Sequence, residues 1–467
     1  MKNNQPGTHT GSTHQTVTEN IKLQIGKKSI QIGFTNQRVS PWAGMLSWAG
    51  YLFKKKVPEL LERMLPHRPT SPNALAPVDT ALSFLAGVVT GADKLTRVAH
   101  LRADPLLPEV LQVKRIGSQS TFTRFFNRFT QAENQSCFGQ FYRWTLEQLN
   151  SRKEGYTLDL DTTGLIHEDG HQQGVKAGYT KQGIKPCLHP ILGVLAEAKV
   201  VVNFWLRAGN TATLNNALGF LSDLLSHLPH HIALRLVRAD SGFCSTSLFE
   251  RLEERHLPYV VAARLLRPIK NLISKGLVWQ PTEIAGTCVA ERPYQEHGWS
   301  KARRLILIRH EVQEKRRVGG KRLIDCPGYL FQGLVTSLGP EVSALSVWRE
   351  YNGRAGIEGV IKELRHGYGL QQFCCQNFWA TEAVLSMVVM AYNLVVLFQR
   401  FLGWMDRYAV GTLRFGLFTA AGIISRKGGI TTVKLAIPPR RRSWWTRLWE
   451  RLASPFPNCN AVTPLFG

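Results

Sequence analysis

Two strand-like segments that each carry an aspartate restrict the fold of this chain more than any other feature of its sequence. The run 156–162 alternates apolar and polar side chains, which predicts a β-strand with Asp159 and Asp161 on one face. Asp240 ends the apolar run 232–240 and is followed by Ser and Gly. Because α/β sheets build their sites at the tips of strands, the two segments predict carboxylates at the edge of a sheet.

The order of the elements around these aspartates predicts an α/β fold class. Three strands joined by hairpins precede a helix, a strand, a second helix and a last strand, and the later strands join through helical crossovers. This is the order of an RNase H-like core, in which the first and fourth strands are neighbours, so we expect Asp161 and Asp240 to meet. The predicted elements lie at about 156–162, 188–195, 200–206, 214–225, 232–240, 246–255 and 259–263.

A third acid lies in a later segment whose spacing suits a helix. At about 100° per residue, five side chains fall within one stripe roughly 80° wide. These residues are Tyr351, Arg354, Glu358, Lys362 and Arg365. A carboxylate among cations and a tyrosine is suited to a phosphate and metal site. The alternative is a solvated helix face stabilised by ion pairs.

With these motifs in this order, the chain resembles the DDE transposases of bacterial insertion sequences, in the group often called transposase DDE domain group one. The family signature Y-x2-R-x3-E-x6-K corresponds here to Tyr351, Arg354, Glu358 and Arg365, and the segments LDLDTT, LRAGNT and VRADSGF add to the resemblance over about 115–435. The last position departs from the family lysine. Arginine keeps the charge but not the point-charge geometry, which puts in doubt the phosphate contact usually given to that lysine.

The resemblance implies a catalytic site of three acids, Asp161, Asp240 and Glu358. In such a site they hold two Mg²⁺ or Mn²⁺ ions per active site, because both ions prefer oxygen ligands. Asp161 would bind both ions, Asp240 one and Glu358 the other. Asp159 remains a rival for the first position because it shares the strand face, although an aspartate followed by two hydroxyl residues, as at Asp161, matches the family pattern.

The resemblance also implies the function of the whole chain. We expect a DNA transposase that binds the terminal inverted repeats of an insertion sequence and catalyses DNA cleavage and strand transfer into target DNA. It would act as a homodimer on double-stranded DNA in the cytoplasm of a bacterium, associated with the nucleoid. Two alternatives remain: an RNase H-like nuclease or resolvase without strand transfer, and an inactive DNA-binding relic of an element.

The charge of the chain agrees with a nucleic-acid partner. Lys and Arg number 58 against 33 acidic residues, a formal net charge of +25. An excess of this size favours binding to a polyanion, although ribosomal and membrane-surface proteins share it. Six residues are predicted to contact DNA: Tyr351, Arg354, Lys362, Arg365, Arg124 and Arg128.

The last two of these arginines belong to the segment 120–129, which predicts an amphipathic helix. Its phenylalanines form one face, and Thr121, Arg124 and Arg128 lie on the other, where they suit a groove of DNA. The alternative is a helix whose outer face is merely soluble.

Composition and periodicity divide the chain into six parts. We expect a disordered N-terminus (1–20), a mainly helical DNA-binding region (21–150) and the first part of the core (151–266). A β-rich insertion (267–345), the second part of the core with the third acid (346–435) and a basic aromatic tail (436–467) follow. The apolar run 383–398 is short for a membrane span, so we expect a core helix and no membrane. No C-x2-C pair occurs, so no zinc site is predicted.

Overall fold

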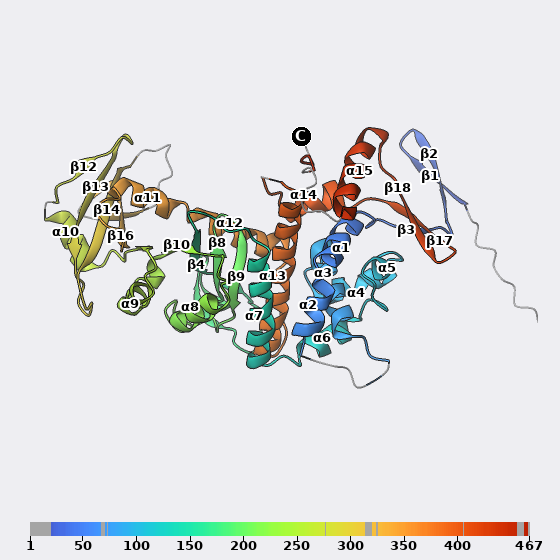
Figure 1. The fold of residues 1–467 in the computed structure, drawn as a ribbon, viewed down its shortest axis with the longest axis horizontal. Coiled ribbons are helices and arrows are strands. Elements are labelled where there is room, and N and C mark those ends of the chain that lie inside the picture. The colour runs from blue at the N-terminus through green and yellow to red at the C-terminus, as the bar shows by residue number, and fades with distance from the viewer. Residues whose placement is uncertain are drawn as a thin grey trace, which may run out of the picture.

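A mixed sheet of ten strands runs through the protein (Figure 1). The computed structural model describes residues 20–66, 71, 73–275, 277–312, 320–323, 326–404, 406–454 and 462–465. The predicted disordered segment 1–20 lies outside these residues, apart from Asn20, which begins β1 (Asn20–Ile25). The fold is of the mixed α/β kind that the sequence predicts.

The centre of the sheet holds the strands that were expected to carry the acids. The order β11-β10-β4-β8-β9 joins Tyr259–Ala262, Leu234–Ala239, Tyr156–Thr162, Ile191–Leu195 and Val200–Trp205. Strands β4 and β10 are parallel neighbours, with Leu160 opposite Ala239, which confirms that the first and fourth predicted strands lie side by side. Helices α8 (Ala217–Ser226) and α9 (Thr246–Glu254) connect β9 to β10 and β10 to β11.

One part of this region differs from the prediction. The single strand expected at about 188–195 is divided, because β7 (Gly183–Leu188) ends before Pro190 and β8 begins after it. His189 and Pro190 lie between the two strands, and Pro190 has no N–H group to donate to a ladder, but proline alone does not end a strand here because Pro186 lies within β7. With β5 (Leu165–Ile166) and β6 (Lys176–Thr180), β7 forms a small three-stranded sheet that the sequence analysis did not predict.

The segment predicted as a β-rich insertion extends the main sheet. Strand β16 (Cys326–Thr336) pairs antiparallel with β11, and the remaining strands add outward from it to one end of the elongated molecule (Figure 1). The other elements here are α10 (Arg267–Ser274), β12 (Gln280–Pro281), β13 (Thr287–Tyr294), β14 (Arg303–Glu311) and β15 (Lys321–Leu323).

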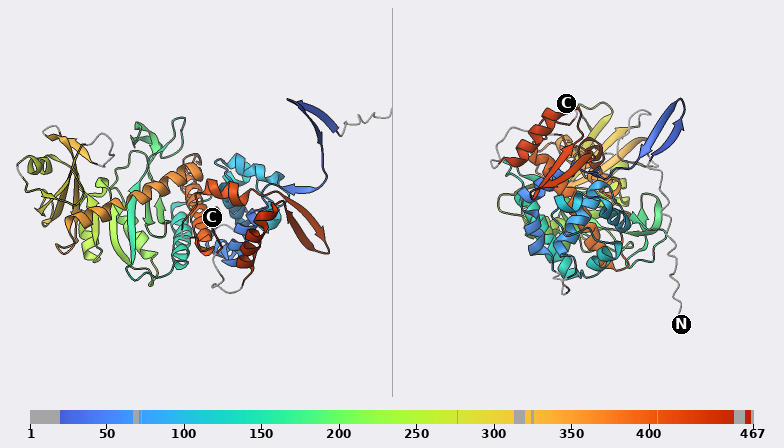
Figure 2. Two further views of the ribbon diagram at one scale, coloured as in Figure 1. Left: turned by 90° about the horizontal axis from the view of Figure 1, so that it is seen from above. Right: turned by 90° about the vertical axis from the view of Figure 1, so that its right-hand side faces the viewer.

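The opposite end of the molecule combines the two termini of the described chain (Figure 2). A short strand, β3 (Arg38–Ser40), pairs with β17 (Gly422–Lys427), which pairs with β18 (Ile430–Leu435). The C-terminal α15 (Pro439–Ala453) packs beside α1, with Trp444, Trp445 and Leu448 buried. The main N-terminal helices are α1 (Met45–Lys54), α2 (Val57–Met64), α3 (Pro77–Thr90), α4 (Leu95–His100), α5 (Leu107–Val110), α6 (Gln119–Phe126) and α7 (Gln131–Glu147).

A long apolar helix joins this end to the sheet. Helix α13 (Phe378–Phe401) contacts α3, α7 and β9. It is long and apolar enough to cross a membrane, yet its most apolar 18-residue window is entirely buried inside the protein. The apolar run 383–398 therefore lies in a core helix, as predicted.

A buried ion pair fixes the two central parallel strands to each other. Arg238 of β10 donates from Nε and Nη2 to the two carboxylate oxygens of Asp159 on β4, at 2.6 and 2.9 Å. Its Nη1 donates to the main-chain oxygen of Glu350, at 2.6 Å. Asp159 is fully buried and Arg238 nearly so. The three bonds tie β4, β10 and the segment after the sheet into one unit.

Removing one partner of this pair leaves the other charge buried. We expect Asp159→Ala to lower the free energy of unfolding by about 3–5 kcal/mol. Urea denaturation followed by circular dichroism measures the loss. Glu147→Ala is the control, because Glu147 pairs with Arg143 on an exposed helix face and its removal costs about 0.5 kcal/mol or less. A loss below about 1 kcal/mol for Asp159→Ala would contradict this account.

Candidate active site

Three carboxylates from distant parts of the chain line one cavity of about 560 Å³. Asp161 lies near the end of β4, Asp240 directly follows β10, and Glu358 lies in the first turn of α12 (Ala355–Gly367). The parallel pairing of β4 and β10 brings the first two acids to the same edge of the sheet, and α12 contacts β4. The wall also includes Lys181, His189, Thr213, Arg354, Lys362 and Arg365.

The helical stripe that predicted Glu358 is divided between two helices. Helix α11 (Ala344–Asn352) ends before Gly353, and α12 begins after Arg354. A Cβ atom at Gly353 would lie 2.4 Å from Nη1 of Arg238, so glycine allows the close approach of that guanidinium. The expectation of one continuous helix is therefore wrong at this junction, although both linking residues keep right-handed helical dihedral angles.

The members of the stripe have different environments. Arg354 is buried, whereas the side chain of Glu358 is 60% exposed. Lys362 and Arg365 line the cavity, and Arg365 donates to the side-chain oxygen of Gln371. Tyr351 does not line the cavity; it packs against a hydrophobic cluster around Val347 and Leu334.

Asp161 is the most strongly perturbed acid of the cavity. Burial raises the pKa of its carboxyl to about 6, the adjacent Arg354 opposes that rise, and the negative charges of Asp240 and Glu358 add to it. Nη2 of Arg354 lies 2.9 Å from Oδ1 of Asp161 and also donates to the main-chain oxygen of Leu160, at 3.2 Å. The arginine thus supplies the positive charge that the buried carboxylate needs.

The other two acids are less enclosed. Oδ1 of Asp240 accepts a hydrogen bond from the main-chain N–H of Gly242 at 2.9 Å, which fixes the turn after β10. Oε2 of Glu358 lies 4.0 Å from Nζ of Lys181. Lys181 lies in the turn between β6 and β7, and sequence reasoning missed it because the strands 176–180 and 183–188 were not recognised. The alternating side chains around its Lys-Gln-Gly turn were the available signal.

The structure also separates the two aspartates of β4. Asp159 is paired with Arg238 inside the protein and does not line the cavity. Asp161 lines the cavity together with Asp240 and Glu358. The remaining predicted DNA contacts, Arg124 and Arg128, line a different cavity beside α6.

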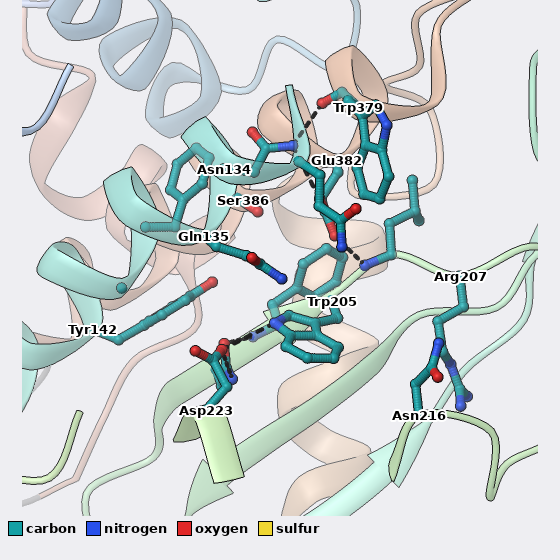
Figure 3. A pocket seen from close by; sticks show the side chains of 16 residues that line it. Asn134, Gln135, Tyr142, Trp205, Arg207, Asn216, Asp223, Trp379, Glu382 and Ser386 are labelled. Carbon is teal, nitrogen blue, oxygen red and sulfur yellow. Dashed lines mark hydrogen bonds between the residues drawn. The ribbon is translucent and has the colours of Figure 1, made fainter. Parts of the chain in front are cut away.

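A smaller cavity of about 90 Å³ lies between α7, β9 and α13 (Figure 3). Burial raises the pKa of Glu382 to about 7, and its two carboxylate oxygens accept hydrogen bonds from the Asn134 side chain and the Leu206 main chain, at 3.0 and 2.8 Å. Trp205 donates to Asp223 at 3.1 Å on the other side of this cavity. The network attaches the end of β9 to the helices behind it.

The loop that follows β9 reaches back to the larger cavity through Arg207. This buried arginine donates to the main-chain oxygens of His189, Ala212, Thr213 and Asn215, at 3.0 to 3.3 Å. His189 and Thr213 both line the larger cavity. The LRAGNT segment thus shapes one wall of the candidate site from within.

Comparison with known proteins decides the family. A family model described as transposase DDE domain group 1 matches residues 22–454. The chain belongs to this family and is a DDE transposase. No match was found among curated proteins. One solved structure with which the chain can be superposed is a piggyBac transposase synaptic complex with hairpin DNA, at 13% identity and a TM-score of 0.44 over 91% of this chain and 90% of that one.

DDE transposases generally use divalent metal ions, and the donors in this cavity suit such ions. Carboxylate oxygens are the ligands that Mg²⁺ and Mn²⁺ prefer. Among the residues that the structure describes, no three His, Cys, Asp or Glu side chains are grouped closely enough to hold one ion. Mg²⁺ usually keeps several waters beside one or two carboxylates, so a site for it does not need three grouped side chains.

The raised pKa of Asp161 predicts how metal affinity depends on pH. Since protons and cations compete for this carboxylate, Mn²⁺ affinity should fall about tenfold for each pH unit below about 6 and level off above about 7. Electron paramagnetic resonance of free Mn²⁺ between pH 4.5 and 8 measures the affinity. Asp161→Asn should bind Mn²⁺ weakly, without this pH dependence. A midpoint near 4, the usual value for aspartate, would contradict the assignment.

Proposed function

We propose that this transposase binds the terminal inverted repeats of its insertion sequence, cuts the DNA strand at the element end and transfers that end into target DNA. The observation that carries the proposal is the meeting of Asp161, Asp240 and Glu358 in one cavity. The three acids come from three separate segments, so their meeting is a property of the fold rather than of one local motif.

The strand arrangement supports an RNase H-like core within this transposase. Strands β9, β8 and β4 are antiparallel neighbours, β10 and β11 join β4 in parallel, and helices α8 and α9 make the connections. In such a core the first and fourth strands carry the first two acids. The third acid would follow the insertion, as Glu358 does.

Six residues that line the cavity have a role in this proposal. Asp161 would hold both metal ions, Asp240 one and Glu358 the other. When bound, two Mg²⁺ or Mn²⁺ ions activate the attacking oxygen and stabilise the leaving oxygen of an in-line displacement at phosphorus. Arg354 orients Asp161 through their 2.9 Å contact. Lys362 and Arg365, which line the cavity, would hold phosphates near the reacting bond.

The reaction that we propose has two displacement steps. Water attacks the phosphorus at the element end, and the 3′ oxygen leaves as a hydroxyl. That hydroxyl then attacks a phosphodiester of the target, whose own 3′ oxygen leaves. Joining two ends of one element needs two active sites, so we propose a homodimer on double-stranded DNA, in the cytoplasm of a bacterium at its nucleoid.

The surface charge supports DNA as the partner. The chain carries a formal net charge of +25, which favours a polyanion over a neutral substrate. Lys362 and Arg365 would contact the DNA near the reacting bond, and Arg124 and Arg128 would contact it farther away. Of the other two predicted contacts, Arg354 is buried against Asp161 and Tyr351 does not line the cavity, so both would act on the DNA only through the site.

A cleavage and strand-transfer assay tests this function. Purified protein is incubated with labelled DNA that carries the ends of the element, in the presence of Mg²⁺ or of EDTA. Asp161→Asn, Asp240→Asn and Glu358→Gln should each lower the rate of joining by about 10³-fold or more, because each removes a metal ligand from the transition state. Binding of the same DNA should persist. Glu147→Gln, an exposed acid on α7, is the matched control and should keep full activity.

The assay also separates the two alternatives. Metal-dependent cleavage without joining would favour a nuclease or resolvase. Binding without any chemistry in either metal would favour an inactive relic. Full activity in any of the three acid variants would contradict the assignment of that acid to the active site.

A further inference from the structure

We propose that Arg115, Arg124 and Arg128 form an anchor for a DNA backbone phosphate, away from the catalytic cavity and without sequence preference. The three arginines line a cavity of about 360 Å³ between α6 and the start of α3. The inference rests on the proposed function, since DNA is the polyanion that it invokes. It differs from the expectation that the outer face of α6 lies in a groove of DNA.

The inner face of α6 is fixed by aromatic packing. Phe122, Phe125 and Phe126 are buried, and the rings of Phe126 and Phe122 lie 5.0 and 6.3 Å from Phe84 of α3. The side chain of Ser118 accepts a hydrogen bond from the N–H of Thr121 and caps the helix. The helix is therefore held against α3, and the direction of its outer side chains follows from that packing.

The arginines of this cavity are not neutralised by acids. Among the residues that the structure describes, none of the three forms an ion pair. Arg124 donates from Nε to the main-chain oxygen of Ser120 at 3.3 Å, which leaves its two terminal nitrogens for another acceptor. The nearby acid Asp79 accepts from the main-chain N–H of Lys114 and does not line the cavity.

Three exposed guanidinium groups around one hollow suit a tetrahedral anion with several acceptor oxygens. Arginine donates to phosphate in a forked geometry, and several donors can share one phosphate group. Thr121 also lines this hollow, and its hydroxyl is hydrogen-bonded to that of Ser118 at 2.9 Å, so the arginines are the main donors to an anion here.

The shape of the site favours the DNA backbone over base edges. A side chain that reads a base must project into a groove, whereas these arginines surround a concavity. The phosphate ridge of a duplex is convex and can enter such a concavity. Contacts of this kind position DNA and carry no direct sequence information.

The test is DNA binding by the full chain at several salt concentrations. Fluorescence anisotropy is measured with a duplex of the terminal repeat and with a shuffled duplex of equal length. We expect Arg115→Gln, Arg124→Gln and Arg128→Gln each to lower the affinity for both duplexes by the same factor, about fivefold to tenfold at low salt. Each should also reduce the slope of log affinity against log salt, and the three together should reduce it by about 0.9, the contribution of one neutralised phosphate.

Two controls keep the result specific. Arg143→Gln removes an exposed arginine that is already paired with Glu147, and it should leave both affinities and the slope nearly unchanged. Arg128→Lys keeps the charge without the forked donor and should restore most of the salt slope. Circular dichroism spectra of all the variants should match that of the wild type, since the substituted side chains are exposed.

Several outcomes would overturn the inference. Loss confined to the terminal-repeat duplex would mean base reading. Unchanged binding of both duplexes, together with wild-type inorganic phosphate binding that the substitutions abolish in calorimetry, would mean a site for the free ion. Unchanged binding with no phosphate uptake would mean that the cavity is unused. Each of these outcomes leaves the proposed function intact, whereas failure of the wild type to bind either duplex at low salt would contradict both.

Discussion

The buried ion pair between Asp159 and Arg238 connects the segments that carry the three candidate acids. Asp159 lies two residues before Asp161, Arg238 lies two residues before Asp240, and Arg238 also binds the main chain of Glu350 at the end of α11. A pair of this kind contributes less to net stability than to a single defined geometry, because desolvation offsets the attraction. Here we infer that it fixes the register of β4 against β10 and the entry of α12. The positions of the three candidate carboxylates then follow from the path of the backbone.

The cavity beside this ion pair holds three acids, which need positive charge nearby. Burial and two neighbouring acids raise the pKa of Asp161, and Arg354 and the main-chain N–H of Thr162 oppose that rise. On the open side, Lys181, Lys362 and Arg365 face the same space. The acids suit metal ions, and the surrounding cations suit the phosphates of a polyanion. One cavity thus offers carboxylates that suit a metal ion and cations that suit a phosphate, as the proposed phosphoryl transfer requires.

The sequence predicted the elements whose side-chain periods are strong and local. Alternation predicted β4, an apolar run that ends in Asp240 predicted β10, and the order of the elements predicted that these two strands are neighbours. It did not predict the small sheet of β5, β6 and β7, because those strands are short and partly exposed, and the alternation around the turn at Lys181 is a weak signal over so few residues. Nor could it choose between Asp159 and Asp161, since both share a strand face and the choice depends on Arg238, a tertiary contact. Nor could it show why position 353 is glycine, because the guanidinium of Arg238 that approaches it is a neighbour in space and not in sequence.

Cleavage of the polypeptide by bound Fe²⁺ tests the central claim most directly. Fe²⁺ takes the place of Mg²⁺, and with ascorbate and peroxide it releases hydroxyl radicals that cut the main chain near the metal. The account predicts cuts close to Asp161, Asp240 and Glu358 together, suppressed by excess Mg²⁺ and by Asp161→Asn. Cuts near only one of these acids, or at sites away from all three, would show that they do not share a metal site, and the proposed chemistry would be wrong.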